Sequence, residues 1–575
     1  MSNPETDILD SLSSELSQQL KDYIDQTLLE IIRPNSASQF AHDAPELAKF
    51  REAVAQSDSK DDIEFLRSFR EFVTLTNYKH YQPFTAKFFA TPCKEADVKN
   101  MFAPGLPYFI AMSSMTSGNT AKTFPIYRHA QRLANNPLHF SRSEGSTLSL
   151  TSLDFWQNLK LDCEDGQKPL PVCSVTIGAL RMQMNWDIEH DMDRLDMWVP
   201  GKTAPYAVSL VKSYRSFFVL NALFALADRG VTTAAFTFGN TFLSFLQYVE
   251  DEWDILVDCI EKGIIPDIEQ IDHVREALEK LFKPNPTRAA ELREIGPPVI
   301  HGWAVRVWPN LNKFVGITGG PGAIAYILGP SVRTQGAGYG GSEAGIAIPY
   351  QKGNPSTDFK IVFVDGVIEF LDVQSSEPLE HILSAHEVVA GGQYEPILTT
   401  RNGLWRYSLG DVITVKGFAP EDGLPIINYL HRRDGALAQT FGTTCSESQL
   451  TNAIVSAARY IGQITDFTIV SDDREATIAY GYLVEIGGEI VQDTRVATQH
   501  AFDHLMRANA EYRFTFFQGR SRQPTIRLVE KGTFTEYRRQ KCEKTNVSMG
   551  QLKIPVVISD PALKEWFLEK VIMEL

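Results

Sequence analysis

The chain has 575 residues, of which 43% are hydrophobic and 22% are charged, and its formal net charge at pH 7 is −16. These shares are ordinary for a soluble globular protein, and the length suits about three or four folding units. An acidic field repels phosphate backbones, so the charge argues against general nucleic-acid binding without excluding a bound nucleotide.

Three amphipathic patterns predict helices. Over the first ~35 residues, apolar side chains recur every three or four positions until Pro34. A second apolar stripe covers residues 241–262 and ends at Gly263, a residue type common just past a helix end. Near the C-terminus, Asp560 is the expected N-cap of a last helix that buries apolar side chains as far as Val571.

Short apolar runs between these helices predict strands at residues 314–317, 360–364, 367–371, 394–399, 411–416 and 426–430. Asp365 and Gly366 separate two of these runs and predict a tight hairpin. The mixture predicts an α/β or α+β chain. We place a domain boundary near Arg433 and Asp434, because a stretch with its own helices and strands follows.

Cysteine usage and the N-terminus predict a cytoplasmic protein. The 6 cysteines include no C-x-x-C pair, which argues against a zinc site and against a disulfide scaffold. The N-terminus lacks a basic region followed by an apolar core, so we expect no signal peptide. The longest apolar run, residues 217–227, contains Asn221 and is about half of the ~20 residues that a membrane span needs.

Residues 113–122 combine five hydroxyl side chains with a glycine and a lysine. Hydroxyl and loop N–H groups can surround phosphate oxygens, and a lysine adds positive charge. The segment is not a Walker A loop, because the G-x-x-x-x-G-K-[ST] pattern is missing. A polar surface turn is the alternative. The candidate phosphate ligands are Ser113, Ser114, Thr116, Ser117, Gly118 and Lys122.

A second, glycine-rich segment comprises Tyr339, Gly340, Gly341, Ser342 and Glu343. Its tyrosine ring could stack on a base, and its carboxylate could help to hold Mg²⁺ against phosphates. The alternative is a glycine-rich turn between two strands.

Three single residues complete the candidates. Asp411 follows a glycine at a strand start, where a carboxylate can accept two hydrogen bonds from a ribose diol. Arg432 lies beside the predicted boundary and could reach a nucleotide. Lys553, on a short loop, could donate to an acyl-phosphate oxygen in a closed site. The plainer alternatives are a turn aspartate, a solvated charge run and a surface lysine.

The order, spacing and identity of these segments resemble the Gretchen Hagen 3 acyl-acid amido synthetases. That family belongs to the superfamily of acyl-CoA synthetases, peptide-synthetase adenylation domains and luciferases. Its phosphate loop, S-S-G-T-S followed by Gly, Lys and Pro, is matched by residues 113–118, Lys122 and Pro125. Residues 339–343 match its Y-A-S-S-E segment, and residues 407–412 match its Y-R-x-G-D-V segment. The similarity extends over about residues 15–560.

The resemblance implies a large N-terminal domain, residues 1–432, of β-sheets flanked by helices plus a β-barrel part, which would bind ATP and the acyl substrate. A small, mobile α+β domain, residues 433–575, would follow. The implied reaction has two steps. A carboxylic acid attacks the α-phosphate of ATP, with Mg²⁺ on the leaving pyrophosphate, and an amine, expected to be an amino acid, then takes the acyl group. No obligate protein partner is implied.

The resemblance also implies roles for the candidate residues. The implied catalytic set is Lys122, Glu343 and Lys553. The implied adenine and ribose set is Tyr339, Gly340, Gly341, Ser342, Asp411 and Arg432. Glu343 would hold Mg²⁺ with the phosphates, and Lys553, on the moving domain, would act in one half-reaction.

Several positions depart from the family pattern. Met115 stands where the family has glycine, Gly340 and Gly341 stand where it has alanine and serine, and Ser408 and Val556 stand where it has arginine. Two alternatives stay open beside the amido synthetase. One is an acyl-CoA ligase of the same superfamily, in which a thiol accepts the acyl group. The other is a non-catalytic adenylate-binding regulatory protein.

Overall fold

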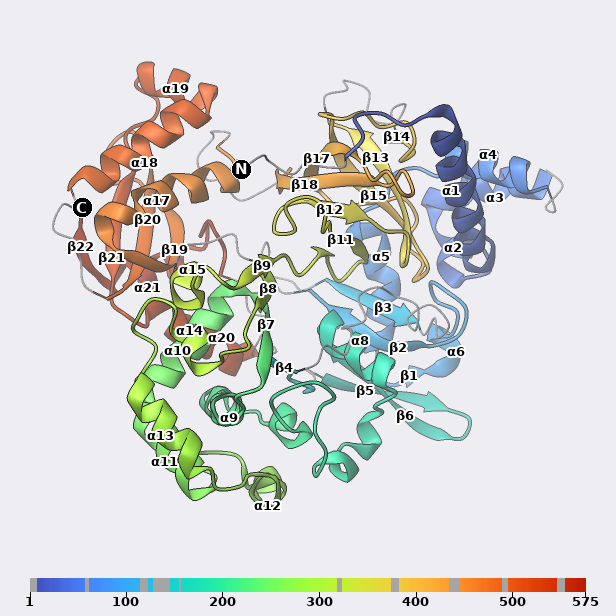
Figure 1. The fold of residues 1–575 in the computed structure, drawn as a ribbon. Helices are drawn as coiled ribbons and strands as arrows, with labels where there is room; N and C mark the ends of the chain where they lie inside the picture. The colour runs from blue at the N-terminus through green and yellow to red at the C-terminus, as the bar shows by residue number, and fades with distance from the viewer. Residues whose placement is uncertain are drawn as a thin grey trace.

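The computed structural model describes residues 8–56, 61–113, 122–127, 145–154, 157–317, 323–373, 382–433, 445–488, 495–545 and 554–575. Within these ranges the strands form four sheets with helices around them, which confirms the predicted mixed α/β class. Figure 1 shows the last part of the chain, in orange and red, beside the green elements of the middle part. No helix in the described ranges is long and apolar enough to cross a bilayer.

The N-terminal helices lie on the sheet that carries most of the candidate site. The hydroxyl of Ser13 accepts the N–H of Leu16 and caps α1 (Ser14–Asn35), which confirms the first predicted helix. α1 contacts β13 (Gly366–Asp372) and β15 (Gln393–Thr400). The helices that follow are α2 (Gln39–Asp43), α3 (Ala48–Gln56), α4 (Asp62–Phe72), α5 (Tyr78–Thr85) and α6 (Glu95–Val98).

The candidate phosphate loop leaves a five-stranded sheet in the order β1-β5-β6-β2-β3. β2 (Pro107–Met112) and β3 (Thr123–Tyr127) are antiparallel, and Met112 pairs with Thr123, so residues 113–122 connect the two strands of a hairpin. The other members are β1 (Cys93–Lys94), β5 (Gln157–Cys163) and β6 (Gly166–Cys173), and α8 (Val175–Met184) contacts β2.

A parallel sheet leads to the second candidate segment. It consists of β4 (Ser146–Ser149), β7 (Val231–Phe238), β8 (Lys313–Ile317) and β9 (Arg333–Gln335), and β8 confirms the strand predicted at residues 314–317. Ligands of parallel sheets gather beyond the carboxyl ends of the strands. The chain reaches Tyr339 four residues after β9 ends.

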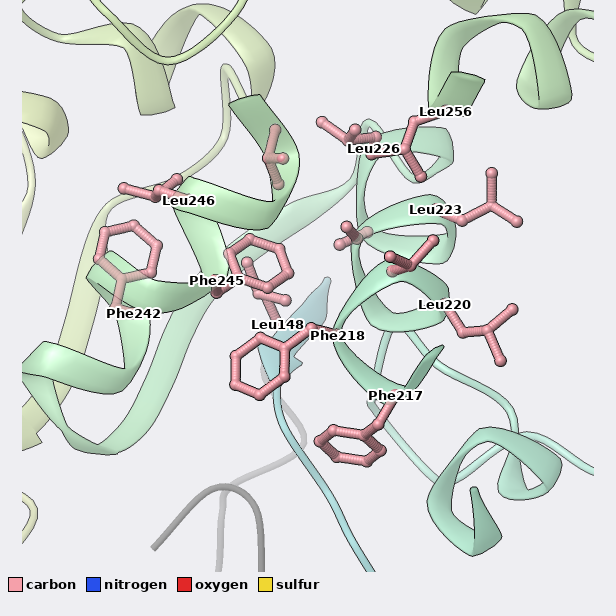
Figure 2. Close-up of a cluster of buried hydrophobic side chains, with 14 of the residues drawn as sticks. Leu148, Phe217, Phe218, Leu220, Leu223, Leu226, Phe242, Phe245, Leu246 and Leu256 are labelled. Atoms are coloured by element: carbon pink, nitrogen blue, oxygen red, sulfur yellow. The ribbon is translucent and has the colours of Figure 1, made fainter. Parts of the chain in front are cut away.

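The apolar run of residues 217–227 lies in α9 (Tyr214–Ala227), whose side chains are buried almost throughout. Figure 2 shows Phe218 of α9, Phe245 of α10 and Leu148 of β4 in one cluster of buried side chains. A helix that is apolar on all sides belongs inside a core, which explains why this run has no amphipathic period.

The single helix predicted over residues 241–262 is wrong, because the structure has two helices, α10 (Gly239–Asp251) and α11 (Trp253–Lys262). The break falls at Glu252, whose carboxylate accepts a hydrogen bond from Arg215 Nε at 2.9 Å. Gly263 follows α11 with φ 68°, as predicted. Further along lie α12 (Asp272–Leu281), α13 (Pro286–Ile295), α14 (Trp303–Val307) and α15 (Ala323–Leu328).

A nine-stranded sheet has the order β10-β11-β12-β18-β17-β15-β13-β14, with β16 paired to β15. It confirms the strands predicted at residues 394–399, 411–416 and 426–430, which are β15, β17 (Asp411–Phe418) and β18 (Pro425–Arg432). The remaining members are β10 (Tyr339–Gly340), β11 (Gly345–Pro349), β12 (Phe359–Ile361), β14 (Ile382–Leu383) and β16 (Tyr407–Ser408).

The hairpin predicted at Asp365 and Gly366 is wrong. β12 pairs with β11 and β18, whereas β13 pairs with β14 and β15. Asp365 contacts other segments instead: its carboxylate accepts the N–H of Gly345 at 2.8 Å, and its carbonyl accepts the N–H of Arg401 at 2.8 Å. A turn signal predicts where the chain reverses, but it does not choose the strand partner.

The last part of the chain contains a sheet in the order β19-β20-β21-β22 with helices on both faces. One face packs on α17 and α18, and the other packs on α20 and α21. Asp560 caps α21 as predicted, but Val571, expected in that helix, begins β22. The elements are α17 (Glu447–Ile461), β19 (Gln463–Asp472), β20 (Ala479–Gly487), α18 (Arg495–Ala508), α19 (Ala510–Phe517), β21 (Thr525–Val529), α20 (Thr533–Thr545), α21 (Pro561–Leu568) and β22 (Val571–Glu574).

A buried polar cluster joins this last sheet to α10. Arg538 of α20 pairs with Asp466 of β19, and its Nη1 also donates to the hydroxyl of Ser244 at 2.9 Å. Asn240 donates to Asp466 at 2.8 Å. Around the cluster, apolar side chains of both parts, such as Phe534 and Leu246, share one core.

We predict that Arg538→Ala lowers the free energy of unfolding by about 3–5 kcal/mol, because it leaves the Asp466 carboxylate buried without its cation. Arg539→Ala is the matched control, since Arg539 pairs with Glu536 and Glu543 at the surface and should cost less than about 1 kcal/mol. Urea unfolding of both variants measures the difference. Equal losses in the two variants would show that the buried pair adds nothing.

Candidate functional site

Five of the predicted site residues lie close together, although they are far apart in the sequence: Lys122, Tyr339, Glu343, Asp411 and Arg432. Burial lowers the pKa of the Lys122 ammonium, and the charges of Glu343, Arg432 and Asp411 all act on it. The charges of Lys122 and Arg432 in turn act on the Glu343 carboxyl and lower its pKa. The hairpin of β2 and β3 and the nine-stranded sheet therefore bring these side chains to one place.

Lys122 lies at the base of the candidate phosphate loop. The N–H of Ser113 donates to the carbonyl of Lys122 at 2.9 Å, and the N–H of Lys122 donates to the Ser113 hydroxyl at 3.0 Å. The Lys122 ammonium donates to the Tyr407 hydroxyl at 3.4 Å. These contacts hold both ends of the loop beside β16. The predicted ligands Ser114, Thr116, Ser117 and Gly118, and the departure Met115, lie outside the described residues.

Asp411 is held by donors from two other strands of the nine-stranded sheet, β10 and β18. The Tyr339 hydroxyl donates to Oδ2 at 2.8 Å, and Arg432 Nε lies 3.2 Å from Oδ1. Asp411 and Arg432 face each other in the register of β17 and β18, so the pair follows directly from strand pairing. Arg432 Nη2 also donates to the carbonyl of Leu409 at 3.2 Å, which fixes the turn before Asp411.

Glu343 is only 8% exposed, and its burial raises the pKa of its carboxyl, while Lys122 and Arg432 lower it. The turn that carries Glu343 is closed by the N–H of Gly341, which donates to the carbonyl of Ala344 at 3.0 Å. A Cβ at Gly340 would lie 2.7 Å from that carbonyl oxygen, so this position needs glycine. Ser342 is half-buried in the same turn.

Glu343 alone offers too few ligands for a magnesium ion, so the phosphates of a bound nucleotide would have to supply further ligands. The described residues contain no group of three or more His, Cys, Asp or Glu side chains that could hold a metal. Mg²⁺ typically uses one or two carboxylates together with substrate phosphates and water. Glu343 beside the loop at Lys122 suits that arrangement.

Glu395 is a site residue that the sequence did not reveal. It is 2% exposed, and it accepts hydrogen bonds from the Ser408 hydroxyl, from Gly410 N–H at 3.0 Å and from Arg433 Nη1 at 2.9 Å. It thus ties the turn before Asp411 to the predicted domain boundary. The only feature of the sequence that could have indicated Glu395 is a carboxylate within the apolar run of β15, because a buried charge needs a partner.

Arg406 anchors the same turn to the N-terminal helices. It is buried, it has φ 42°, and it donates to both carboxylate oxygens of Glu369 at 2.9 and 2.7 Å. It also donates to the carbonyls of Arg70 and Val73 at 2.8 and 3.0 Å. These bonds fix the backbone just before Tyr407, which contacts Lys122.

The C-terminal candidates are described only in part. Lys553 lies outside the described residues. Val556 lies next to β19, where its carbonyl accepts the N–H of Ile469 at 2.8 Å, and its side chain packs on the core of the last sheet. Valine at this position therefore has a packing role.

Comparison with known proteins relates the chain to one family over most of its length. Residues 13–326 match the GH3 family N-terminal domain, residues 361–432 the GH3 family central domain and residues 448–562 the GH3 family C-terminal domain.

Individual relatives and a solved structure agree with this match. The jasmonoyl–L-amino acid synthetase GH3.5 of Oryza sativa subsp. japonica is 25% identical over 330 residues, which is 52% of this chain and 55% of that protein. The putative indole-3-acetic acid-amido synthetase GH3.9 of Arabidopsis thaliana is 24% identical over 347 residues, which is 54% of this chain and 59% of that protein. The chain thus spans little more than half the length of these relatives.

The structure of a GH3.15 acyl acid amido synthetase has the same fold, with a TM-score of 0.75 at 20% sequence identity, and the match covers 98% of this chain and 96% of that one. The predicted fold is confirmed by this match. The three domain matches show that the chain belongs to the GH3 family.

Proposed function

We propose that this protein is an ATP-dependent acyl-acid amido synthetase, which adenylates a carboxylic acid and transfers the acyl group to an amine. The observation that carries the proposal is the convergence of Lys122, Tyr339, Glu343, Asp411 and Arg432 on one place. ATP needs three kinds of partner side by side: a ring for its base, a hydrogen-bond acceptor for its ribose diol and a cation for its phosphates. Membership of the GH3 family supports the same reaction.

In the first step the site orients ATP. Asp411 accepts the ribose hydroxyls, the Tyr339 ring packs on adenine and Arg432 contacts the nucleotide from the boundary side. Lys122 and the loop that it closes bind the β- and γ-phosphates. Glu343 is the carboxylate that would hold Mg²⁺, which neutralises charge on the departing pyrophosphate. The substrate carboxylate attacks the α-phosphate and pyrophosphate leaves. This step is needed because the carbon of a free carboxylate is a poor electrophile, whereas the acyl-adenylate has AMP as a good leaving group.

In the second step an amine attacks the acyl carbon and AMP leaves. One relative is named a jasmonoyl–L-amino acid synthetase, and the other is named a putative indole-3-acetic acid-amido synthetase. We therefore propose an amino acid as the amine. The division at residues 432 and 433, the movement of the C-terminal domain and the role of Lys553 in one half-reaction belong to this proposal. Rotation of that domain would separate Asn240 from Asp466 and Ser244 from Arg538.

The cellular compartment is proposed on the cysteines. All six are free thiols, and most of them are buried. Free thiols without disulfides suit a reducing compartment, and we therefore place the protein in the cytoplasm.

The reaction is tested by pyrophosphate–ATP exchange across a panel of carboxylic acids, followed by product analysis with amino acids or coenzyme A. We expect at least one acid to support exchange and the product to be an amide. Formation of an acyl-CoA alone would favour the ligase alternative. ATP binding without exchange for any acid would favour the regulatory alternative.

We predict that Asp411→Ala weakens binding of ATP or of the transition state by about 2–4 kcal/mol, because charge-assisted hydrogen bonds to the ribose are lost. The control is Asp473→Ala, which removes a carboxylate that is 63% exposed and pairs with Lys564. Steady-state kinetics with varied ATP measure both variants. Unchanged kinetics in Asp411→Ala would remove the ribose role from this residue.

The pH profile tests the buried lysine. Since burial lowers the pKa of Lys122, the ammonium loses its proton at a lower pH than the ~10.4 of a free lysine, and phosphate binding weakens as the pH rises through that value. We expect kcat/KM for ATP to fall on the alkaline side below pH ~10.4. Lys122→Arg should move this alkaline limb upward, because a guanidinium stays protonated. An unmoved limb would assign it to another group.

A further inference from the structure

The carboxylate of Asp411 is oriented before any nucleotide binds. Its two oxygens receive donors from opposite sides: the Tyr339 hydroxyl of β10 at 2.8 Å on Oδ2, and Arg432 Nε of β18 at 3.2 Å on Oδ1. The terminal torsion of an aspartate is broad and allows the carboxylate to turn. Donors on both oxygens restrict that rotation.

A vicinal diol needs such a fixed acceptor. Its two hydroxyls lie at a set spacing, so they reach a carboxylate well in one orientation only. A carboxylate has about four acceptor sites, so one oxygen can accept both a supporting donor and a ligand hydroxyl. The Asp411 side chain is 14% exposed, so part of it lies at the surface.

The Tyr339 hydroxyl is itself held in place. The ring lies 6.0 Å from the Tyr429 ring, centroid to centroid, and burial raises the pKa of Tyr339 well above its usual value, so the hydroxyl keeps its proton and donates. The backbone on its C-terminal side is fixed by the close approach of Gly340 to Ala344. The hydroxyl can therefore act as a rigid donor toward Asp411.

We propose that Tyr339 is a positioning residue for ribose recognition: its hydroxyl orients the Asp411 carboxylate for the 2′- and 3′-hydroxyls of the nucleotide, separately from any contact of its ring with the base. The inference rests on the proposed function, because it concerns the same nucleotide site. It predicts that loss of the hydroxyl alone weakens the recognition of the diol and leaves the rest of the nucleotide site intact.

Tyr339→Phe tests the inference, because it removes the hydroxyl and keeps the ring. Isothermal titration would compare ATP with 2′,3′-dideoxy-ATP, which lacks the diol. We expect the variant to bind ATP about tenfold more weakly than the unmodified protein, as for loss of support to a charged hydrogen bond. Its affinity for 2′,3′-dideoxy-ATP should change less than about twofold by the same reasoning.

Two controls make the result specific. Tyr429→Phe removes a hydroxyl from the neighbouring ring, for which the described residues show no hydrogen bond to Asp411, and it should leave the preference for the diol unchanged. In the Asp411→Asn background, Tyr339→Phe should have little further effect on ATP binding, since the hydroxyl acts through the carboxylate. Circular dichroism and thermal unfolding check that each variant is folded.

Three results would overturn the inference. Tighter ATP binding by Tyr339→Phe would mean that the hydroxyl competes with the ribose. Equal weakening of both nucleotides would mean a general structural role. An unchanged affinity for ATP would mean that Asp411 needs no support. Failure of the proposed nucleotide site differs from all of these, because the unmodified protein would then bind neither nucleotide. Failure of catalysis alone is distinguished by pyrophosphate–ATP exchange, which would be absent although ATP binds.

Discussion

The candidate site depends on one constraint: charged groups of both signs are wholly or partly removed from water together, so each must be compensated by another. Lys122, Glu343, Asp411 and Arg432 come from the loop base after β2, the turn after β10 and the paired strands β17 and β18. A lone buried charge is costly, whereas alternating charges at close range stabilise one another. The register of β17 and β18 places Asp411 opposite Arg432, so it also places an anion beside a cation in the site.

A second layer of contacts keeps these groups in position. Glu395 accepts the N–H of Gly410, two residues after Ser408. Arg406, the residue before Tyr407, is held by both carboxylate oxygens of Glu369, which also compensates its charge. The helices after α1 take part, because Arg406 donates to the carbonyls of Arg70 and Val73. The turn before Asp411 is thus tied to elements more than 300 residues away in sequence. Such precision is what catalytic orientation requires.

Much of the fold could be predicted from the sequence where the signal was local. The periodicity of α1, the cap at Asp560 and the strand runs around Asp411 follow from neighbouring residues. The errors arose where distant residues decide. The helix break falls at Glu252, whose carboxylate binds the distant Arg215, and the partners of β12 and β13 are chosen by the rest of the sheet. Neither effect leaves a trace in a short window of sequence.

The site shows the same division. Motif residues with unusual composition could be found, because hydroxyl-rich and glycine-rich segments stand out from ordinary strands. Glu395, Glu369 and Tyr78 could not, since each is a single residue whose partners come from distant strands. Tyr78, for example, accepts the N–H of Thr123 at 3.0 Å and so supports β3 beside Lys122. A lone charge or ring in a sequence has too many plain explanations to be chosen in advance.

If distant segments form one nucleotide site around Lys122, bound nucleotide must shield this lysine. The rate of lysine acetylation, mapped by mass spectrometry with and without Mg²⁺ and ATP, measures that shielding. We predict that the nucleotide slows modification of Lys122 strongly and leaves Lys262, whose side chain is 58% exposed, unchanged. Equal modification of Lys122 in both conditions, with ATP bound, would contradict it.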